Sequence, residues 1–151
     1  MRYLAIDLGE RRTGLAVGDD FTRIATPLTV LDIARADDQG RALLRAVARA
    51  IEEHLGPLDT VLLGLPLNMD GSEGPAAKAL RAWADLLRPL IGNRPILFHD
   101  ERLTSADADW RMARSGLTHA QKKQRRDALA AAAILRDYLE NSPRADDPPR
   151  S

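Results

Sequence analysis

The stretch AIDLGERRTGLAVGD, residues 5–19, decides the fold. It begins inside YLAIDL, residues 3–8, which is apolar on both alternating faces except at Asp7, as in a central strand covered on two sides. After a short turn, TGLAVGD (13–19) and then IATPLTVL (24–31) supply two more β-like runs. Because the connections are short, these three runs predict an antiparallel meander.

Outward from this meander, helical periodicity alternates with short apolar runs. The pattern predicts helices over 38–55, 76–91, 103–117 and 119–140, and strands over 60–65 and 95–99. This order indicates an α/β fold, in which crossovers extend the meander into a five-stranded mixed sheet flanked by helices. We expect residues 1–141 to form one domain, and the polar, proline-rich residues 142–151 to be a disordered tail.

Composition excludes several function classes. The chain is 44% hydrophobic and 29% charged, and Asp7 lies where a signal peptide would carry its apolar stretch. We therefore expect a cytoplasmic protein with no membrane segment. Without cysteine the chain cannot form disulfides or thiolate metal sites, and its three histidines have no metal-binding spacing. Carboxylates are therefore the leading candidates for chemistry.

Asp7 is the first of these carboxylates. An ionised carboxylate in a buried strand is costly unless it is paired, hydrogen-bonded or bound to a metal ion. One explanation is a structural ion pair with Arg11 or Arg12 across the turn. The alternative is a functional acid.

Two more acidic positions have similar settings. Asp100 and Glu101 directly follow the strand over 95–99, where they could accompany a helix N-terminus or form a site. Successive strand residues point to opposite faces, so only one of them is expected to meet Asp7. Asp127 lies at helical spacing in a small, apolar stripe that should face the sheet. The other members of this stripe are Ala131, Ile134 and Tyr138.

Three converging carboxylates fit a hard divalent cation, Mg²⁺ or Mn²⁺, and such sites perform phosphoryl chemistry. A separate basic block could supply contacts to a phosphate backbone, although it could equally be a solvated face. The block runs over residues 110–126, contains no acidic residue, and carries Arg111, Arg114, Lys122, Lys123, Arg125 and Arg126.

Four segments in this order strongly resemble the bacterial YqgF/RuvX-type family, described as pre-16S rRNA nucleases and as Holliday junction resolvases. The segments are AIDLGERRTGLAVGD, LLGLPLNMDGSEGP, HDERLTS and KKQRRDALAAAAILRDYL. The resemblance implies a ribonuclease H-like fold, with Asp7, Glu101 and Asp127 as metal-binding catalytic carboxylates. It also implies nucleic-acid contacts by basic side chains, namely Arg12, Arg102, Lys122, Lys123, Arg125 and Arg126. A substrate loop is expected to contain Asn68, Gly71 and Gly74. Its glycines, together with Gly64, could let backbone N–H groups approach a phosphate.

The expected function is therefore a metal-dependent nuclease that acts on structured RNA or branched DNA, foremost in 5′-end processing of pre-16S rRNA. Cleavage of Holliday junctions is the alternative, and it would favour a homodimer because two symmetry-related strands are cut. The stretch IDLGERRTGLAV also resembles the phosphate loop of actin-type and sugar-kinase-type phosphotransferases, but one domain is short for their two lobes. A non-catalytic binding module is the third possibility.

Overall fold

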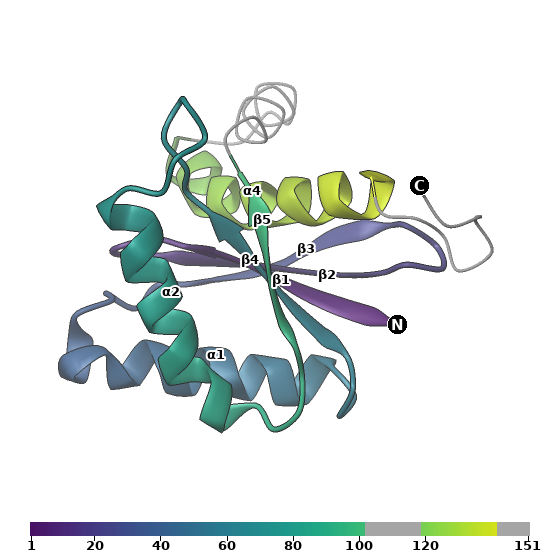
Figure 1. The fold of residues 1–151 in the computed structure, drawn as a ribbon, viewed down its shortest axis with the longest axis horizontal. Coiled ribbons are helices and arrows are strands. Elements are labelled where there is room, and N and C mark those ends of the chain that lie inside the picture. Colours follow the sequence, from purple (N-terminus) through teal and green to yellow (C-terminus); the bar gives the residue numbers. More distant parts are fainter. Residues whose placement is uncertain (102–118, 142–151) are drawn as a thin grey trace.

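The computed structural model describes residues 1–101 and 119–141, except for the side chains of 119–126 (Figure 1). The predicted helix over 103–117, Arg102 and the predicted tail over 142–151 lie outside the described residues. The strands are β1 (Arg2–Leu8), β2 (Thr13–Asp19), β3 (Ala25–Leu31), β4 (Thr60–Leu65) and β5 (Ile96–Asp100). The α-helices are α1 (Arg41–His54), α2 (Pro75–Leu87) and α4 (His119–Asn141), and short 3₁₀ helices span Asp37–Gly40 and Arg88–Leu90.

The five strands form one mixed sheet in the order β3-β2-β1-β4-β5. The pairs β1–β2 and β2–β3 are antiparallel, as the predicted meander requires, whereas β1–β4 and β4–β5 are parallel. The parallel strands are joined by crossovers that contain α1 and α2. The predicted five-stranded mixed sheet is therefore confirmed, and β1 lies at its centre.

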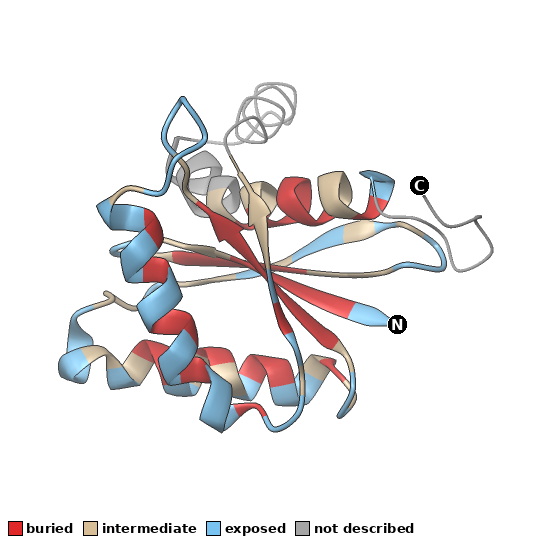
Figure 2. Ribbon diagram, in the orientation of Figure 1, coloured by how far each residue is buried: buried red, intermediate tan, exposed pale blue. Residues whose placement is uncertain are grey.

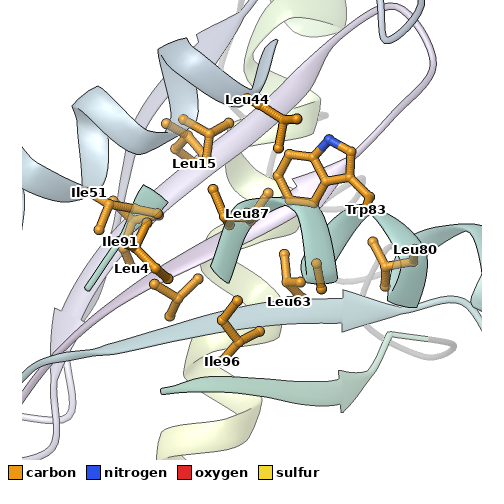
Figure 3. Packing of buried hydrophobic residues seen from close by; sticks show 14 of the residues in the cluster. Leu4, Leu15, Leu44, Ile51, Leu63, Leu80, Trp83, Leu87, Ile91 and Ile96 are labelled. Carbon is orange, nitrogen blue, oxygen red and sulfur yellow. The ribbon is translucent and has the colours of Figure 1, made fainter. Parts of the chain in front are cut away.

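Helices cover both faces of the sheet (Figure 1). On one face α1 and α2 bury a large cluster with Leu4, Leu15 and Leu63 of the sheet, into which Trp83 packs (Figure 3). On the other face α4 packs through alanines and Leu135 onto Ala5 and its neighbours. The outward sides of α1 and α2 are exposed (Figure 2). Among the described residues no helix is both long and apolar enough to cross a membrane.

Two predicted helix boundaries were wrong. The helix expected from residue 38 begins at Arg41, because Asp38 and Gln39 have positive φ angles and Gly40 has φ +86°. The helix expected over 76–91 changes to a 3₁₀ turn at Arg88, directly before Pro89. Neither change moves the helices off the sheet, because their apolar stripes remain buried.

Candidate active site

Asp7 lies one residue before the end of β1, at the carboxyl end of the central strand. It alternates with Tyr3 and Ala5, which pack beneath α4, so its side chain projects from that same face. In β2 its partner is Gly14, which has no side chain to cover it. The Asp7 carboxyl group is therefore partly buried between the sheet and α4.

Glu101 reaches Asp7 from the end of β5. Its backbone N–H donates to the Leu65 carbonyl oxygen over 3.4 Å, which holds it beside β4. The Glu101 side chain crosses Gly64 of β4, where a Cβ atom would come within 2.7 Å of Oε2. The Asp7 and Glu101 carboxyl groups are hydrogen-bonded to each other. The absence of a side chain at Gly64 thus opens the path between the two carboxyl groups.

Asp127 approaches from α4, which lies across the same face of the sheet (Figure 1). A Cβ atom at Gly14 would lie 1.9 Å from the carbonyl oxygen of Asp127 and 2.8 Å from the backbone nitrogen of Ala128. The helix backbone therefore rests directly on β2 at the residue paired with Asp7. Asp127 is partly buried, and Ala131 and Ile134 in its predicted stripe are fully buried against the sheet.

The electrostatics of the site follow from this convergence of acids. Burial, the charge of Glu101, the hydrogen bond with Glu101 and the charge of Asp127 together raise the pKa of Asp7 to about 7. The pKa of Glu101 is also raised, mainly by burial and also by the charge of Asp100, while its hydrogen bond to Asp7 opposes the shift. Without a bound cation, the two carboxyl groups therefore hold a proton at a pH where isolated carboxyls would not.

The alternative explanation of Asp7 as half of a structural ion pair is not realised. Arg12 Nε lies 3.9 Å from Asp32 Oδ1, and Arg11 is exposed. Among the described side chains, no cation contributes to the pKa shift of Asp7. Arg12 instead lines a hollow of about 520 Å³ between β3 and α4, together with Thr29.

The chemistry of the donors fits a hard divalent cation, since carboxylate oxygens are the ligands that Mg²⁺ and Mn²⁺ prefer. A cation would also favour the charged form of Asp7 against the burial and the acidic neighbours that raise its pKa. Within the described part of the chain, no three acidic or histidine side chains are arranged closely enough to hold one ion together. The arrangement is therefore a hydrogen-bonded pair, Asp7 and Glu101, with Asp127 near enough to influence it.

The loop that follows β4 is folded on itself. The Asn68 N–H donates to the Ser72 carbonyl oxygen, and the Gly71 N–H donates to the Asn68 carbonyl oxygen, each over 2.9 Å. Gly71 has φ +88°, which favours glycine, and a Cβ atom at Gly74 would lie 3.0 Å from Asn68 Oδ1. The N–H groups of Asn68 and Gly71 thus donate hydrogen bonds inside the loop. Gly64 lies in β4 and not in the loop, and there it makes room for the Glu101 side chain. A phosphate contact by this loop stays a prediction.

Of the residues predicted to contact nucleic acid, the structure describes only the backbone of those at the start of α4. Lys122, Lys123, Arg125 and Arg126 lie in the first two turns of α4, directly before Asp127. Their side chains lie outside the described residues, as does Arg102. The backbone of α4 nevertheless puts the basic segment and Asp127 on one helix.

Two features of the site were missed by the sequence reasoning. One is the close approach of α4 to Gly14, which no local pattern reports. The other is a pair between His99 Nε2 on β5 and Asp137 Oδ2 on α4, at 2.6 Å. His99 precedes Glu101 by two residues and so shares its face of the strand, which was the available signal. This pair ties the strand that carries Glu101 to the helix that carries Asp127.

The raised pKa of Asp7 predicts that the metal-free protein loses stability as the pH rises. The folded state keeps a proton that the unfolded state releases above its ordinary carboxyl pKa of 3.8, so the free energy of unfolding falls between about pH 4 and pH 7. In chelator, we expect a lower Tm at pH 8 than at pH 5, measured by calorimetry. The decline should be smaller in Asp7→Asn, and an equal decline in both proteins would contradict this assignment.

Comparison with known proteins identifies the family of the chain. The family model described as "RuvX: Holliday junction resolvase" matches residues 1–141. A relative from Anaeromyxobacter sp. (strain Fw109-5), named "Putative pre-16S rRNA nuclease", is 41% identical over 140 residues, covering 93% of this chain and 97% of the relative. A Chloroflexus aurantiacus relative with the same name is 40% identical over 137 residues, covering 91% and 85%.

Solved structures share the fold at low sequence identity. The Fowlpox virus resolvase in complex with Holliday junction DNA aligns with TM-score 0.57 and 12% identity, covering 93% of this chain and 97% of the resolvase. T. thermophilus RuvC in complex with a Holliday junction substrate aligns with TM-score 0.56 and 13% identity, covering 93% and 94%. The fold is thus of the ribonuclease H-like type found in resolvases. By the match over residues 1–141 and the identity to its relatives, the chain belongs to the RuvX family.

Proposed function

We propose that this protein is a divalent-metal-dependent nuclease that hydrolyses phosphodiester bonds in structured nucleic acid. The observation that carries the proposal is the hydrogen-bonded pair of Asp7 and Glu101, with the charge of Asp127 acting on it from α4. Three acids from distant parts of the chain are brought to one end of the sheet, at a cost visible in the raised pKa of Asp7. Acidic side chains that are buried close together, with a raised pKa as the result, are typical of functional sites.

Each acid has a distinct part in the proposed site. Asp7 and Glu101 would hold Mg²⁺ or Mn²⁺ between them, and Asp127, which in this structure acts on Asp7 through its charge, is proposed as a third oxygen ligand that would have to approach the pair on metal binding. The metal would supply Lewis acidity toward the scissile phosphate and lower the pKa of a bound water. The basic segment at the start of α4 would bind the phosphate backbone beside the acids, so binding should weaken steeply with salt.

The names of the relatives support the cleavage of pre-16S rRNA as the activity of this chain, and we propose 5′-end processing as the specific step. The family description and the two resolvase structures favour a second candidate, the cleavage of Holliday junctions. The two candidates differ in symmetry, because resolving a junction requires two active sites on symmetry-related strands. A homodimer is therefore proposed only together with the junction substrate.

The experiment that tests the function offers both nucleic acids to the same protein. A labelled rRNA precursor and a labelled four-way DNA junction are incubated side by side with Mg²⁺, Mn²⁺ or chelator. We expect cleavage of one substrate in the presence of metal and none in chelator. Binding of both substrates without cleavage would contradict the nuclease proposal and favour a non-catalytic module.

A further inference from the structure

His99 connects the edge strand β5 to α4 through one short hydrogen bond. Its Nε2 atom donates to Asp137 Oδ2 over 2.6 Å. Parallel pairing places His99 beside Gly64 of β4, on the face of the sheet that α4 covers. Glu101 follows two residues later and therefore shares this face. The Asp137 carboxylate is also held from its other side, because Asn141 Nδ2 donates to its Oδ1 over 3.2 Å. The bond thus joins two elements that carry or lead into acids of the proposed site.

Buried apolar packing does not make this connection. The apolar cluster beneath α4 takes its sheet residues from β1, β2 and β4, and they are Tyr3, Ala5, Ala16 and Leu62. Leu97, the β5 residue that pairs with Leu62 on this face, is 37% exposed. On the other face of the sheet, Ile96 and Phe98 hold β5 in the cluster with α1 and α2. Within the part of the chain that the structure describes, β5 is therefore joined to α4 by His99 rather than by buried apolar side chains.

Aromatic contacts extend the same connection to the central strand. The His99 ring meets the Tyr138 ring edge to face, with centroids 5.8 Å apart and an interplanar angle of 85°. Tyr138 in turn packs against Tyr3 of β1, with ring centroids 5.4 Å apart, and their hydroxyl groups are hydrogen-bonded. Tyr3 is buried, so this end of the connection is fixed in the core. We call the group of Tyr3, His99, Asp137 and Tyr138 the joint.

The joint repeats the arrangement of the proposed active site. Its residues come from β1, β5 and α4, the elements that carry or lead into the three acids, Asp7, Glu101 and Asp127. Tyr3 lies four residues before Asp7 in β1, on the same face. His99 lies two residues before Glu101, again on the same face. Tyr138 follows Asp127 by eleven residues, or three turns of α4, and shares its side of the helix. A shift of one element at the joint would therefore move an acid of the site.

Glu101 is the acid whose position depends on such support. It follows the last residue of β5, and its backbone N–H meets the Leu65 carbonyl oxygen at 3.4 Å, which is long for a hydrogen bond. Because β4 lies between β5 and β1, the Glu101 side chain crosses a whole strand at Gly64 to reach Asp7. A small rotation of the edge strand would therefore separate the two carboxyl groups.

We infer that His99 and Asp137 are positioning residues, which hold Glu101 against Asp7 so that the two carboxylates can share a metal ion. The inference rests on the proposed nuclease function and adds two residues that lie outside its acidic set. Because the pair acts through Glu101, its loss should weaken metal binding and lower kcat without changing the affinity for nucleic acid. Displacement of a functional group by about an ångström can cost about 10²-fold in rate.

The test compares His99→Ala, Asp137→Ala and the double variant with the wild-type protein. We expect each single substitution to raise the Kd for Mn²⁺ alone about tenfold, measured by isothermal titration calorimetry. On the cleaved substrate, kcat should fall about tenfold while KM stays unchanged. The double variant should lose no more than either single variant, because the two residues act through one bond. His99→Gln keeps an N–H donor near the position of Nε2 and should restore most of the Mn²⁺ affinity and of kcat.

Glu140→Ala is the matched control for the loss of a carboxylate near the end of α4. Glu140 Oε1 lies 3.8 Å from Arg136 Nε on the same helix, and the Glu140 side chain is 62% exposed. The substitution therefore breaks an ion pair within α4 and leaves the bond between Asp137 and His99 intact. We expect wild-type values of the Mn²⁺ Kd and of kcat. The Tm of every variant, measured by calorimetry, shows that the compared proteins are folded at the assay temperature.

The outcomes separate the positioning role from the nuclease proposal. If the wild-type protein cleaves, and both single variants match it in Mn²⁺ affinity and kcat while only their Tm falls, the pair is purely structural and the nuclease function stands. A higher KM at unchanged kcat would also overturn the positioning role, because the pair would then act on substrate binding. If the wild-type protein binds Mn²⁺ but cleaves neither nucleic acid, the nuclease proposal falls and the Mn²⁺ affinities of the variants decide the positioning role. Absence of both Mn²⁺ binding and cleavage in the wild-type protein would end both proposals.

Discussion

Asp7→Asn is expected to reduce metal-dependent cleavage at least about 10³-fold, the largest effect on activity that we predict. The substitution keeps the shape of the side chain but removes one of the two carboxylates that would hold the metal ion. It also removes the group whose pKa is raised to about 7 by burial and by its acidic neighbours. The measurement is kcat/KM on whichever substrate the wild-type protein cleaves.

Loss of activity in Asp7→Asn should not come from unfolding. In chelator at pH 8 the variant is expected to melt at or above the wild-type Tm, because a repulsive charge has been removed from the site. Added Mg²⁺ should raise the Tm of the wild-type protein more than that of the variant. Asp85→Asn, on an exposed turn of α2, is the matched control and should leave cleavage unchanged. Cleavage by Asp7→Asn within tenfold of wild type would refute the assignment.

Gly14→Ala is expected to have the largest effect on stability. The added Cβ atom would lie 1.9 Å from the carbonyl oxygen of Asp127 and 2.2 Å from its carbonyl carbon. Both are helix backbone atoms, so α4 must move away from β2 as a unit. Overpacking of this kind costs up to about 3 kcal/mol, or a Tm lower by roughly 6 to 12 °C in a chain of this size.

The same substitution should reduce cleavage about 10²-fold, because moving α4 by about an ångström misplaces Asp127. Gly56→Ala is the control, since its Cβ would meet the end of the Asp59 side chain at 3.2 Å rather than backbone. Calorimetry and the cleavage assay on both variants provide the measurement. A Gly14→Ala protein with the wild-type Tm would show that α4 does not rest on β2 as described.

Much of the fold was predictable because its determinants are local. Apolar residues on both faces of 3–8, interrupted at Asp7, predicted a central strand, and short connections predicted the antiparallel meander that the sheet contains. Helical spacing predicted the buried stripe of α1, including Val47 and Ile51. The boundary at Arg41 could not be read in this way, because it depends on the left-handed backbone of Asp38 and Gln39 rather than on hydrophobic spacing.

By itself, the sequence determined which acids are candidates for chemistry, because Asp7 and Asp127 interrupt apolar patterns and Glu101 follows a strand. Only the tertiary structure decided how they meet. Glu101 reaches Asp7 because Gly64 of a third segment leaves its path open, and α4 reaches the sheet because Gly14 has no side chain. A glycine looks the same in the sequence whether it serves a turn or a close contact. Its role depends on what the fold places opposite it, which for Gly14 is a residue more than a hundred positions away.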